Sequence, residues 1–242
     1  MPLKIEKYKH GIRKFGKTNF SFIPNNFIKP DSIVYSFGAG EDIRWEIETV
    51  RETGCTIFLF DPTPKAKTHF EKVKACAKEK KEAHPEASFI PYNQTDDIME
   101  KIKLYEFALW NNDEKVRFYE PANKSDVSHS ITNLQKTDEY IEVQAYKIKT
   151  IMDMLYHKHI DFLKMDIEGS EFQVIDNIIE DGIDISGMCL EFHYSKDIGD
   201  FRNVKRLYET IQKMKKNNYK IIHRSTYKYF TVIKENESNS CQ

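Results

Sequence analysis

The sequence predicts an open α/β fold, in which helices cover both faces of a mostly parallel sheet. Short, continuous apolar runs alternate along the chain with segments of helical periodicity. Such runs are typical of parallel strands that are buried on both faces, because a half-exposed strand would alternate apolar and polar residues. A pair of glycines directly after the first run indicates a strand that enters a tight turn before a helix.

The first strand and helix are predicted over residues 32–40 and 41–53. The strand, SIVYSFGAG, is rich in β-branched and aromatic residues and ends in glycines. In the following segment Ile43, Ile47 and Val50 recur at helical spacing, and a glycine comes after its end.

A second strand and helix follow at once. Residues 55–61, CTIFLFD, are a continuous apolar run that ends in an acid. Residues 64–81 are amphipathic, with Phe70, Val73 and Ala77 on one side and lysines on the other. This strand–helix order predicts parallel neighbours joined by right-handed crossovers.

The rest of the chain continues the pattern less regularly, and residues 121–139 form a polar loop that is too long for a simple connection. Strands are predicted over residues 87–92, 103–110, 114–121, 139–148, 160–166 and 187–194, helices over residues 171–181 and 201–218, and an antiparallel C-terminal hairpin over residues 219–224 and 227–234. We predict a lid or wrapping segment at residues 1–30 and one domain at residues 31–242, with the 121–139 loop on the substrate side.

Composition indicates an ordinary soluble chain of 242 residues, with 40% hydrophobic residues, 31% charged residues and a net charge of -1. No global charge favours nucleic acid or an anionic membrane, and no apolar run reaches the roughly 20 residues of a membrane span. The basic N-terminus lacks the apolar segment of a signal peptide. The four cysteines show no paired spacing, so we expect reduced thiols in a cytoplasmic protein.

The glycine turn predicts a site for an adenosine-containing cofactor. Gly38 and Gly40 would let a ligand approach the backbone at a helix N-terminus. Asp61 follows at the tip of the next strand, the spacing at which an acid accepts hydrogen bonds from ribose hydroxyls. A plain tight turn with a helix-capping Asp61 is the alternative.

The acids after the turn favour one cofactor. A dinucleotide fingerprint requires a third glycine where this chain has Ile43. Glu41 and Asp42 would repel a pyrophosphate but suit the sulfonium and ammonium groups of S-adenosylmethionine.

A second polar cluster is predicted where two buried strands end. Asp166 and Glu168 follow one strand, and Glu191 and His193 share a face of the next, because strand side chains alternate. If the strands are neighbours, the four side chains converge at the carboxyl edge of the sheet. Glu171 is expected to stabilise the start of a helix through the helix dipole.

Several roles stay open in this cluster. His193 is either a structural histidine or a catalytic one. Lys164 could form an ion pair with Asp166, which we prefer to a role as a base. The acids and the histidine could also hold Mg²⁺ or Mn²⁺. Their spacing in the sequence does not match a known metal-binding motif, so we predict no metal site.

These segments resemble, in order and spacing, the FkbM family of S-adenosylmethionine-dependent methyltransferases. The resemblance rests on VYSFGAG, FLFDPTP, EFALWNND and DFLKMDIEGSEFQVI followed by LEFH, and it runs from Ser32 to His193. It implies a class I methyltransferase (Rossmann-like) fold, with a seven-stranded, mostly parallel sheet whose last strand pair is antiparallel. The chain departs from the commoner family turn, since Ser36 replaces an acid and Gly40 an asparagine. We therefore expect Glu41 or Asp42 to contact the cofactor's amino group.

The resemblance also implies site residues: the turn would hold the methionine part of the cofactor, Asp61 its ribose, and Ala108 to Trp110 would border the adenine. The predicted cofactor-binding residues are Ser36, Phe37, Gly38, Ala39, Gly40, Glu41, Asp42, Asp61, Pro62, Thr63, Ala108, Leu109 and Trp110. The predicted catalytic residues are His193, Asp166, Glu168 and Glu191, and the predicted substrate-binding residues are Ser128, His129, Ser130 and Lys164.

The implied activity is O-methylation of a sugar hydroxyl. His193 is predicted to take the hydroxyl proton, with His129 as the rival base. The composition, rich in Lys, Asn, Ile and Tyr, is typical of an AT-rich bacterial genome, where such enzymes serve capsule or lipopolysaccharide assembly. We expect a nucleotide-linked sugar as substrate, no nucleic-acid partner and no membrane span, and we leave a homodimer open. An NAD-linked sugar-modifying oxidoreductase and a non-catalytic binding module are the alternatives.

Overall fold

A central sheet organises the molecule in a computed structural model that describes residues 4–16, 22–123, 126, 128–194 and 201–235, with side chains from 204 in the last range. Within these residues seven strands lie in the order β11-β12-β10-β9-β3-β4-β5. Their bounds are β3 Ile33–Phe37, β4 Thr56–Phe60, β5 Ile102–Tyr105, β9 Ile160–Met165, β10 Ile185–Glu191, β11 Tyr219–Arg224 and β12 Tyr229–Lys234.

The pairing confirms a mostly parallel sheet with an antiparallel end. β3 pairs in parallel with β4 and β9, β4 with β5, and β9 with β10. β12 runs antiparallel to both β10 and β11. The C-terminal hairpin therefore closes one edge of the sheet, as predicted.

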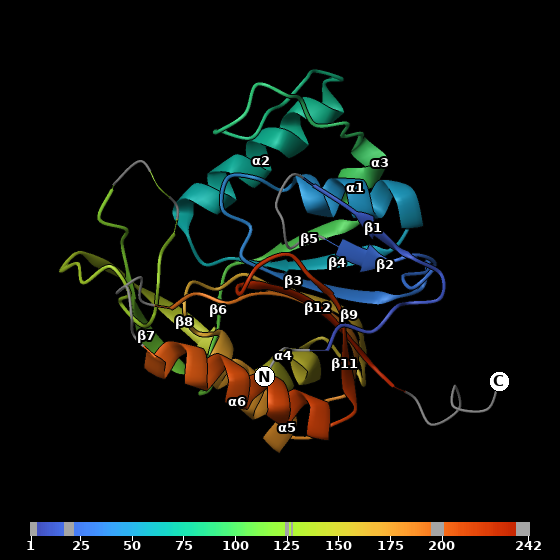
Figure 1. The fold of residues 1–242 in the computed structure, drawn as a ribbon. Helices are drawn as coiled ribbons and strands as arrows, with labels where there is room; N and C mark the ends of the chain where they lie inside the picture. Colours follow the sequence, from blue (N-terminus) through green and yellow to red (C-terminus); the bar gives the residue numbers. More distant parts are fainter. Residues whose placement is uncertain (1–3, 17–21, 124–125, 127, 195–200, 236–242) are drawn as a thin grey trace.

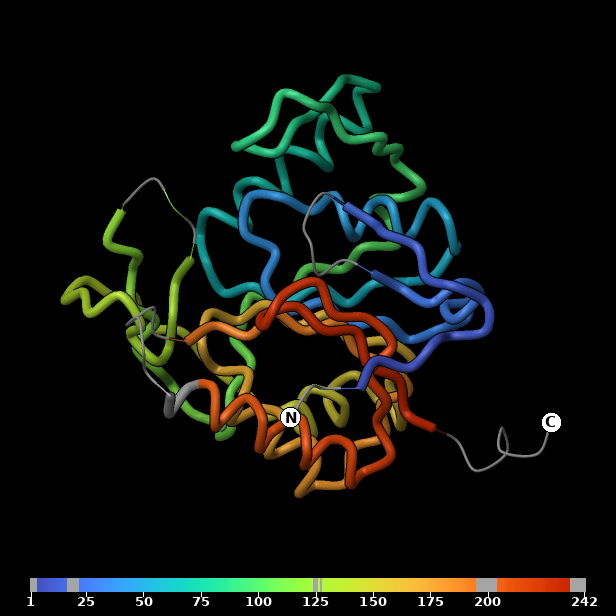
Figure 2. Tube along the Cα trace, in the orientation of Figure 1, coloured from blue at the N-terminus to red at the C-terminus, as the bar shows by residue number. Residues whose placement is uncertain are grey.

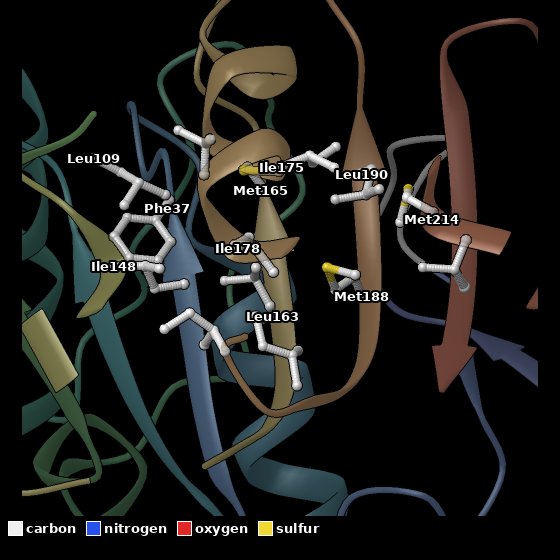
Figure 3. Close-up of a cluster of buried hydrophobic side chains, with 14 of the residues drawn as sticks. Phe37, Leu109, Ile148, Leu163, Met165, Ile175, Ile178, Met188, Leu190 and Met214 are labelled. Atoms are coloured by element: carbon white, nitrogen blue, oxygen red, sulfur yellow. The ribbon is translucent and has the colours of Figure 1, made fainter. Parts of the chain in front are cut away.

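Helices cover both faces of this sheet (Figure 1). One face carries α1 (Arg44–Thr53), α2 (Pro64–Lys78) and α3 (Asp96–Glu100), and the other carries α4 (Ile148–Met154), α5 (Glu171–Glu180) and α6 (Phe201–Lys216). Each layer buries its own apolar cluster against the strands. Figure 3 shows the cluster under α5, where Leu163, Met165 and Leu190 of the sheet lie with Ile178 of the helix. Burying such side chains is the main stabilising contribution to the fold.

Local signals explain where the first helices begin and end. α1 begins at Arg44 and not at the predicted residue 41, because residues 41–43 form the turn after β3. It ends at Gly54, whose φ of 74° is left-handed. α2 begins after Thr63, whose side chain accepts a hydrogen bond from the Ala66 N–H, with proline at its first position.

The polar middle of the chain builds a second, three-stranded sheet in the order β6-β8-β7. Its strands are β6 Ala108–Leu109, β7 Glu114–Tyr119 and β8 Tyr140–Tyr146. The strand predicted over residues 87–92 is wrong: this segment contains turns and bends, and Tyr92 packs under α1 and α2 while Phe89 is fully exposed. α3 and α4 had not been predicted, because each has too few residues for a clear helical period.

The N-terminal segment wraps the sheet, as the tube in Figure 2 shows. β1 (Ile12–Lys14) and β2 (Phe22–Pro24) form an antiparallel pair, and the Glu6 N–H donates to the Ile221 carbonyl at 2.7 Å. Residues 1–3 and 17–21 of the predicted lid, and 124, 125 and 127 of the predicted loop, lie outside the described residues. Over the described residues, every helix is too short or too polar to cross a bilayer.

Candidate active site

A cavity of about 260 Å³ lies at the carboxyl ends of β3, β4 and β9. β3 has β4 on one side and β9 on the other, so the chain order reverses here. Ligands of open α/β sheets bind at such a switch point. The volume is close to the lower end of small-molecule pockets, about 300–1,000 Å³.

Most of the predicted site residues line this cavity. They are Phe37, Gly38, Ala39, Gly40, Glu41, Asp42, Asp61, Pro62, Thr63, Ala108, Leu109, Ser128, His129, Lys164, Asp166 and Glu168. Five predicted residues lie outside the lining: Ser36, Trp110, Ser130, Glu191 and His193. Each of these five packs behind a lining residue or in a neighbouring cluster.

The turn of Gly38, Ala39 and Gly40, called the glycine corner below, lies against the end of β9. Its two glycines have φ values of 87° and 51°. A Cβ on Gly38 would meet the Asp166 carbonyl oxygen at 2.0 Å. Only glycine therefore allows the corner to approach β9 this closely. The contact brings the acidic residues after β9 next to the predicted cofactor turn.

Asp61 holds the glycine corner from the other side. Its Oδ2 accepts hydrogen bonds from the Ala39 and Gly40 N–H groups, both at 3.0 Å. Its Oδ1 accepts from the N–H and hydroxyl of Thr63, at 2.9 and 2.6 Å. A carboxylate has about four acceptor positions, so a ribose hydroxyl would share or replace one of these donors. The ribose contact of Asp61 stays a prediction.

A buried polar network underlies the corner. The Ser36 hydroxyl donates to Glu46 Oε1 at 2.6 Å, and Lys164 Nζ lies 3.2 Å from the same oxygen. Lys164 also donates to the Gly38 carbonyl at 2.9 Å. Ser36 therefore faces Glu46 of α1 and not the cavity. Glu46 had not been predicted, although its place three residues after Ile43 and four before Val50 puts it on the apolar face of α1.

Aromatic side chains form the part of the wall near β4 and β6. Phe37 and Phe60 stack with ring centroids 4.4 Å apart, and Phe107 lies beside Phe60 at 5.4 Å. Together with Leu109 they give a flat apolar surface that suits an adenine ring. Phe107 takes the place predicted for Trp110, which packs instead in the cluster of the smaller sheet.

His193 lies behind the cavity in a pocket of acids. Its Nδ1 is 3.0 Å from Glu171 Oε1. Its Nε2 is 3.2 Å from Glu191, 3.5 Å from Glu168 and 3.9 Å from Asp166. Ligand atoms of Asp166, Glu191 and His193 all lie within 4.8 Å of one another, a spacing that a divalent ion could bridge.

Glu171, which was predicted only to stabilise the start of a helix, also contacts His193 and the loop after β9. Its side chain is fully buried. It accepts hydrogen bonds from the Gly169 N–H and from the His193 N–H as well as facing the imidazole. Glu168, three residues before the start of α5, has a left-handed φ of 51°, which few residues other than glycine adopt. The loop after β9 is thus arranged around His193.

Charge in this pocket sets the protonation of two residues. Burial alone would lower the pKa of His193, but hydrogen bonds with Glu171 and Glu191 and the nearby acids raise it to about 11. Burial, followed by the charge of Glu191, raises the pKa of Asp166 to about 8. At neutral pH His193 is therefore an imidazolium, which has no lone pair to accept a proton.

The loop after β7 closes the other side of the cavity. His129 is buried and stacks on Phe118, with ring centroids 5.6 Å apart. The Ser130 hydroxyl donates to the Glu168 carbonyl, which ties the loop to the segment after β9. Ser130 is thus a structural contact in this arrangement, whereas Ser128 and His129 face the cavity.

Comparison with known proteins agrees with this geometry. The sequence model of the family described as "Methyltransferase FkbM domain" matches residues 11–221. The chain belongs to the FkbM methyltransferase family. Its fold is the class I methyltransferase fold, and its methyl donor is S-adenosylmethionine. Membership excludes the NAD-linked alternative.

Two solved structures are similar at low identity. A fibrillarin pre-rRNA processing protein of Methanococcus jannaschii is 12% identical, with a TM-score of 0.43, over 94% of this chain and 72% of that one. TYW2 of M. jannaschii, in complex with AdoMet, is 13% identical, with a TM-score of 0.32, over 86% of this chain and 68% of that one. No curated protein matches the sequence.

The cavity residues fit the cofactor. The absent Cβ atoms of the glycine corner leave room for a ligand against the backbone. Besides Asp166, four acidic side chains line the wall, those of Glu41, Asp42, Asp61 and Glu168. They favour a ligand with positive sulfonium and ammonium groups.

Proposed function

We propose that this protein is an S-adenosylmethionine-dependent O-methyltransferase that acts on a sugar hydroxyl. One observation carries the proposal: Asp166 and Glu168 line the same cavity as the glycine corner. An acceptor held by these carboxylates would therefore lie beside the methyl donor. Sugars present several hydroxyl donors, which carboxylates bind well.

The chain's contribution to the reaction is mainly positioning. When bound, S-adenosylmethionine would supply an electrophilic methyl group, whose carbon the acceptor oxygen could attack in line while the S–C bond breaks and S-adenosylhomocysteine leaves. Glu168 and the residues of the loop after β7 would orient the acceptor, because a well-oriented pair of reactants gains several orders of magnitude in rate.

A sugar hydroxyl must also lose its proton, and we assign that step to Asp166. The sequence predicts His193 as the base, with His129 as the rival. His193 is protonated at neutral pH and lies outside the cavity lining. Asp166 lines the cavity and has a pKa of about 8, close to the working pH at which a general base is most effective.

In this arrangement His193 is a positioning residue. Its imidazolium lies between Glu171, which is fully buried, and the carboxylates of Asp166 and Glu168, which face the cavity. The positive charge offsets part of the repulsion among Asp166, Glu168 and Glu191. It thereby holds these acids together at the acceptor side.

The biological substrate in this proposal is a nucleotide-linked sugar, methylated before it enters a surface polysaccharide. The support is the family resemblance and the absence of a membrane-spanning helix among the described residues. The acceptor sugar itself would be chosen by loops such as residues 128–131.

The test is incubation of the purified protein with methyl-labelled S-adenosylmethionine and a panel of nucleotide sugars. We expect one sugar to gain the mass of one methylene together with the label. If the protein binds S-adenosylhomocysteine but methylates none of the sugars, while a protein or small aromatic hydroxyl takes the label, the sugar assignment is wrong. Cofactor binding without any transfer would favour a non-catalytic module.

A further inference from the structure

Lys164 is a buried cation in the wall of the cofactor cavity. It comes from β9, two residues before Asp166, and is 5% exposed. Its Nζ donates to the Gly38 carbonyl at 2.9 Å and lies 3.2 Å from Glu46 Oε1. The ammonium group therefore sits at the glycine corner and not at the surface of the sheet.

The cost of burying this charge argues for a role beyond stability. Glu46 is itself fully buried and is fixed by the Ser36 hydroxyl at 2.6 Å. Replacing a buried ion pair by apolar side chains of similar volume is often neutral or stabilising. Stability alone therefore does not explain a lysine here. Burial alone would lower the pKa of Lys164, but Glu46 and Asp166 outweigh it and raise the pKa, so the side chain stays charged.

The carboxylate of the cofactor is the one charged group that the acids of the cavity would not favour. S-adenosylmethionine carries a sulfonium, an ammonium and one carboxylate. Acidic side chains line the wall, those of Glu41, Asp42, Asp61 and Glu168 in addition to Asp166, and the ionised ones would repel that carboxylate. Two basic side chains, Lys164 and Arg44, also line it. The guanidinium of Arg44 donates to the carbonyls of Ile90 and Pro91, at 2.8 and 3.2 Å, which directs it toward the segment beside α1.

The order of the sheet decides which end of the cofactor lies near Lys164. The strands run β9-β3-β4-β5 across the cavity. The aromatic wall of Phe60 and Phe107 lies on the β4 side, and Lys164 lies on the β9 side. With the adenine on the aromatic wall and the corner at the centre, the methionine end would extend toward β9.

We propose that Lys164 binds the carboxylate of the cofactor's methionine moiety, and that Glu46 is a positioning residue that holds the Lys164 ammonium at the glycine corner. The proposal rests on S-adenosylmethionine as the cofactor and is independent of the acceptor sugar. It differs from the predicted roles of Lys164 in substrate binding or in an ion pair with Asp166.

The test compares two ligands that differ at the proposed contact. S-adenosylhomocysteine has the amino acid end, whereas 5′-methylthioadenosine has the same adenosine and thioether without it. Isothermal titration calorimetry would measure both affinities for the wild type, Lys164→Met, Lys164→Gln and Glu46→Gln. Lys103→Met is the matched control, because Lys103 is an exposed lysine of β5 over the Phe58 ring, in the same sheet but outside the cavity.

We expect Lys164→Met to lower the affinity for S-adenosylhomocysteine about 10- to 100-fold, which corresponds to the loss of one charge-assisted hydrogen bond. Its affinity for 5′-methylthioadenosine should stay within about twofold, within the usual scatter of such effects. Glu46→Gln should give a smaller loss for S-adenosylhomocysteine alone. Lys103→Met should change neither affinity.

Two results would overturn the proposal. An equal loss of affinity for both ligands in Lys164→Met and Lys164→Gln would show that Lys164 only supports the shape of the corner. Unchanged affinity for S-adenosylhomocysteine in both variants would show that the carboxylate binds elsewhere. Retained binding of 5′-methylthioadenosine would show that the adenosine pocket is folded in each variant. If the Lys164 variants are unfolded by circular dichroism, Lys164 is required for folding, and the proposal is likewise wrong.

Discussion

Asp166 and His193 show how neighbouring groups decide the chemistry of a residue. A histidine normally titrates near neutral pH, yet His193 lies within 4 Å of four carboxylates, those of Asp166, Glu168, Glu171 and Glu191. These raise its pKa to about 11, and burial together with the charge of Glu191 raises that of Asp166 to about 8. The residue type alone favours His193 as the base, and the surroundings favour Asp166.

The pH dependence of turnover tests this assignment. A carboxylate accepts a proton only when ionised, and its ionised fraction rises with pH through its pKa. Turnover should therefore be low at pH 6, rise through about pH 8 and level off above it. A His193 base with its pKa of about 11 would give a rise near pH 11. Initial rates across pH 6–10 at saturating cofactor separate the two.

Substitution at Asp166 and at His129 tests the same step independently. Asp166→Asn should lower kcat about 100-fold or more while leaving S-adenosylhomocysteine affinity within a few fold, because only the proton acceptor is lost. His129→Gln is the matched comparison, since His129 also lines the cavity, and it should act mainly on KM for the acceptor. The opposite pattern would make His129 the base.

At the scale of elements, the turn between β3 and α1 depends on the absence of a side chain. Gly38→Ala would place a Cβ 2.0 Å from the Asp166 carbonyl oxygen. Gly182, which follows α5, also has a positive φ, of 61°, but nothing lies within 4 Å of its Cβ position. An alanine would have a strained backbone at both positions, but only at position 38 would its Cβ also clash with a neighbour.

Chemical denaturation and calorimetry of these two variants test the role of the corner. Gly182→Ala should lose about 1–2 kcal/mol of unfolding free energy, the cost of a left-handed alanine, and bind S-adenosylhomocysteine normally. Gly38→Ala should lose more stability and at least about tenfold in affinity, because β3 and β9 must separate at the cavity. Normal affinity in Gly38→Ala would contradict the proposed placement of the cofactor.

Elements differ in how well their sequence predicts them. β4 is almost entirely apolar, and β9 is apolar apart from Asp161 and Lys164, which is the pattern of strands that are buried on both faces. β1 and β2 are three residues each, too short for any period to show. Residues 87–92 contain strand-forming residues, yet Arg44 binds the Ile90 and Pro91 carbonyls, so tertiary contacts override propensity.

At the scale of the whole molecule, charge is distributed unevenly around the carboxyl edge of the sheet. Acids surround both the glycine corner and the acceptor side, although the net charge of the chain is only -1. Lys164 and His193 are the cations that balance them in our proposals, and the charges of both act on Asp166. A positive cofactor adds to this balance.

Chelation tests whether a metal ion is part of that balance. We expect turnover to persist in excess EDTA, because the His193 imidazolium already supplies positive charge among the acids. If EDTA abolishes turnover and Mg²⁺ or Mn²⁺ restores it, an ion bridges Asp166, Glu191 and His193, whose ligand atoms lie within 4.8 Å. The control is circular dichroism in EDTA, which separates loss of activity from loss of fold.

The amino-acid sequence by itself determined the alternating elements, the glycine corner and the convergence of Asp166 and Glu168 beside it. These follow from local periodicity and from the rule that parallel strands end at one edge. Only the tertiary structure decided that Glu46 pairs with Lys164, that Glu171 holds His193, and that Phe107 and not Trp110 faces the cavity. Each of these depends on which side chains from distant segments share a buried volume, and burial and charge then set their protonation.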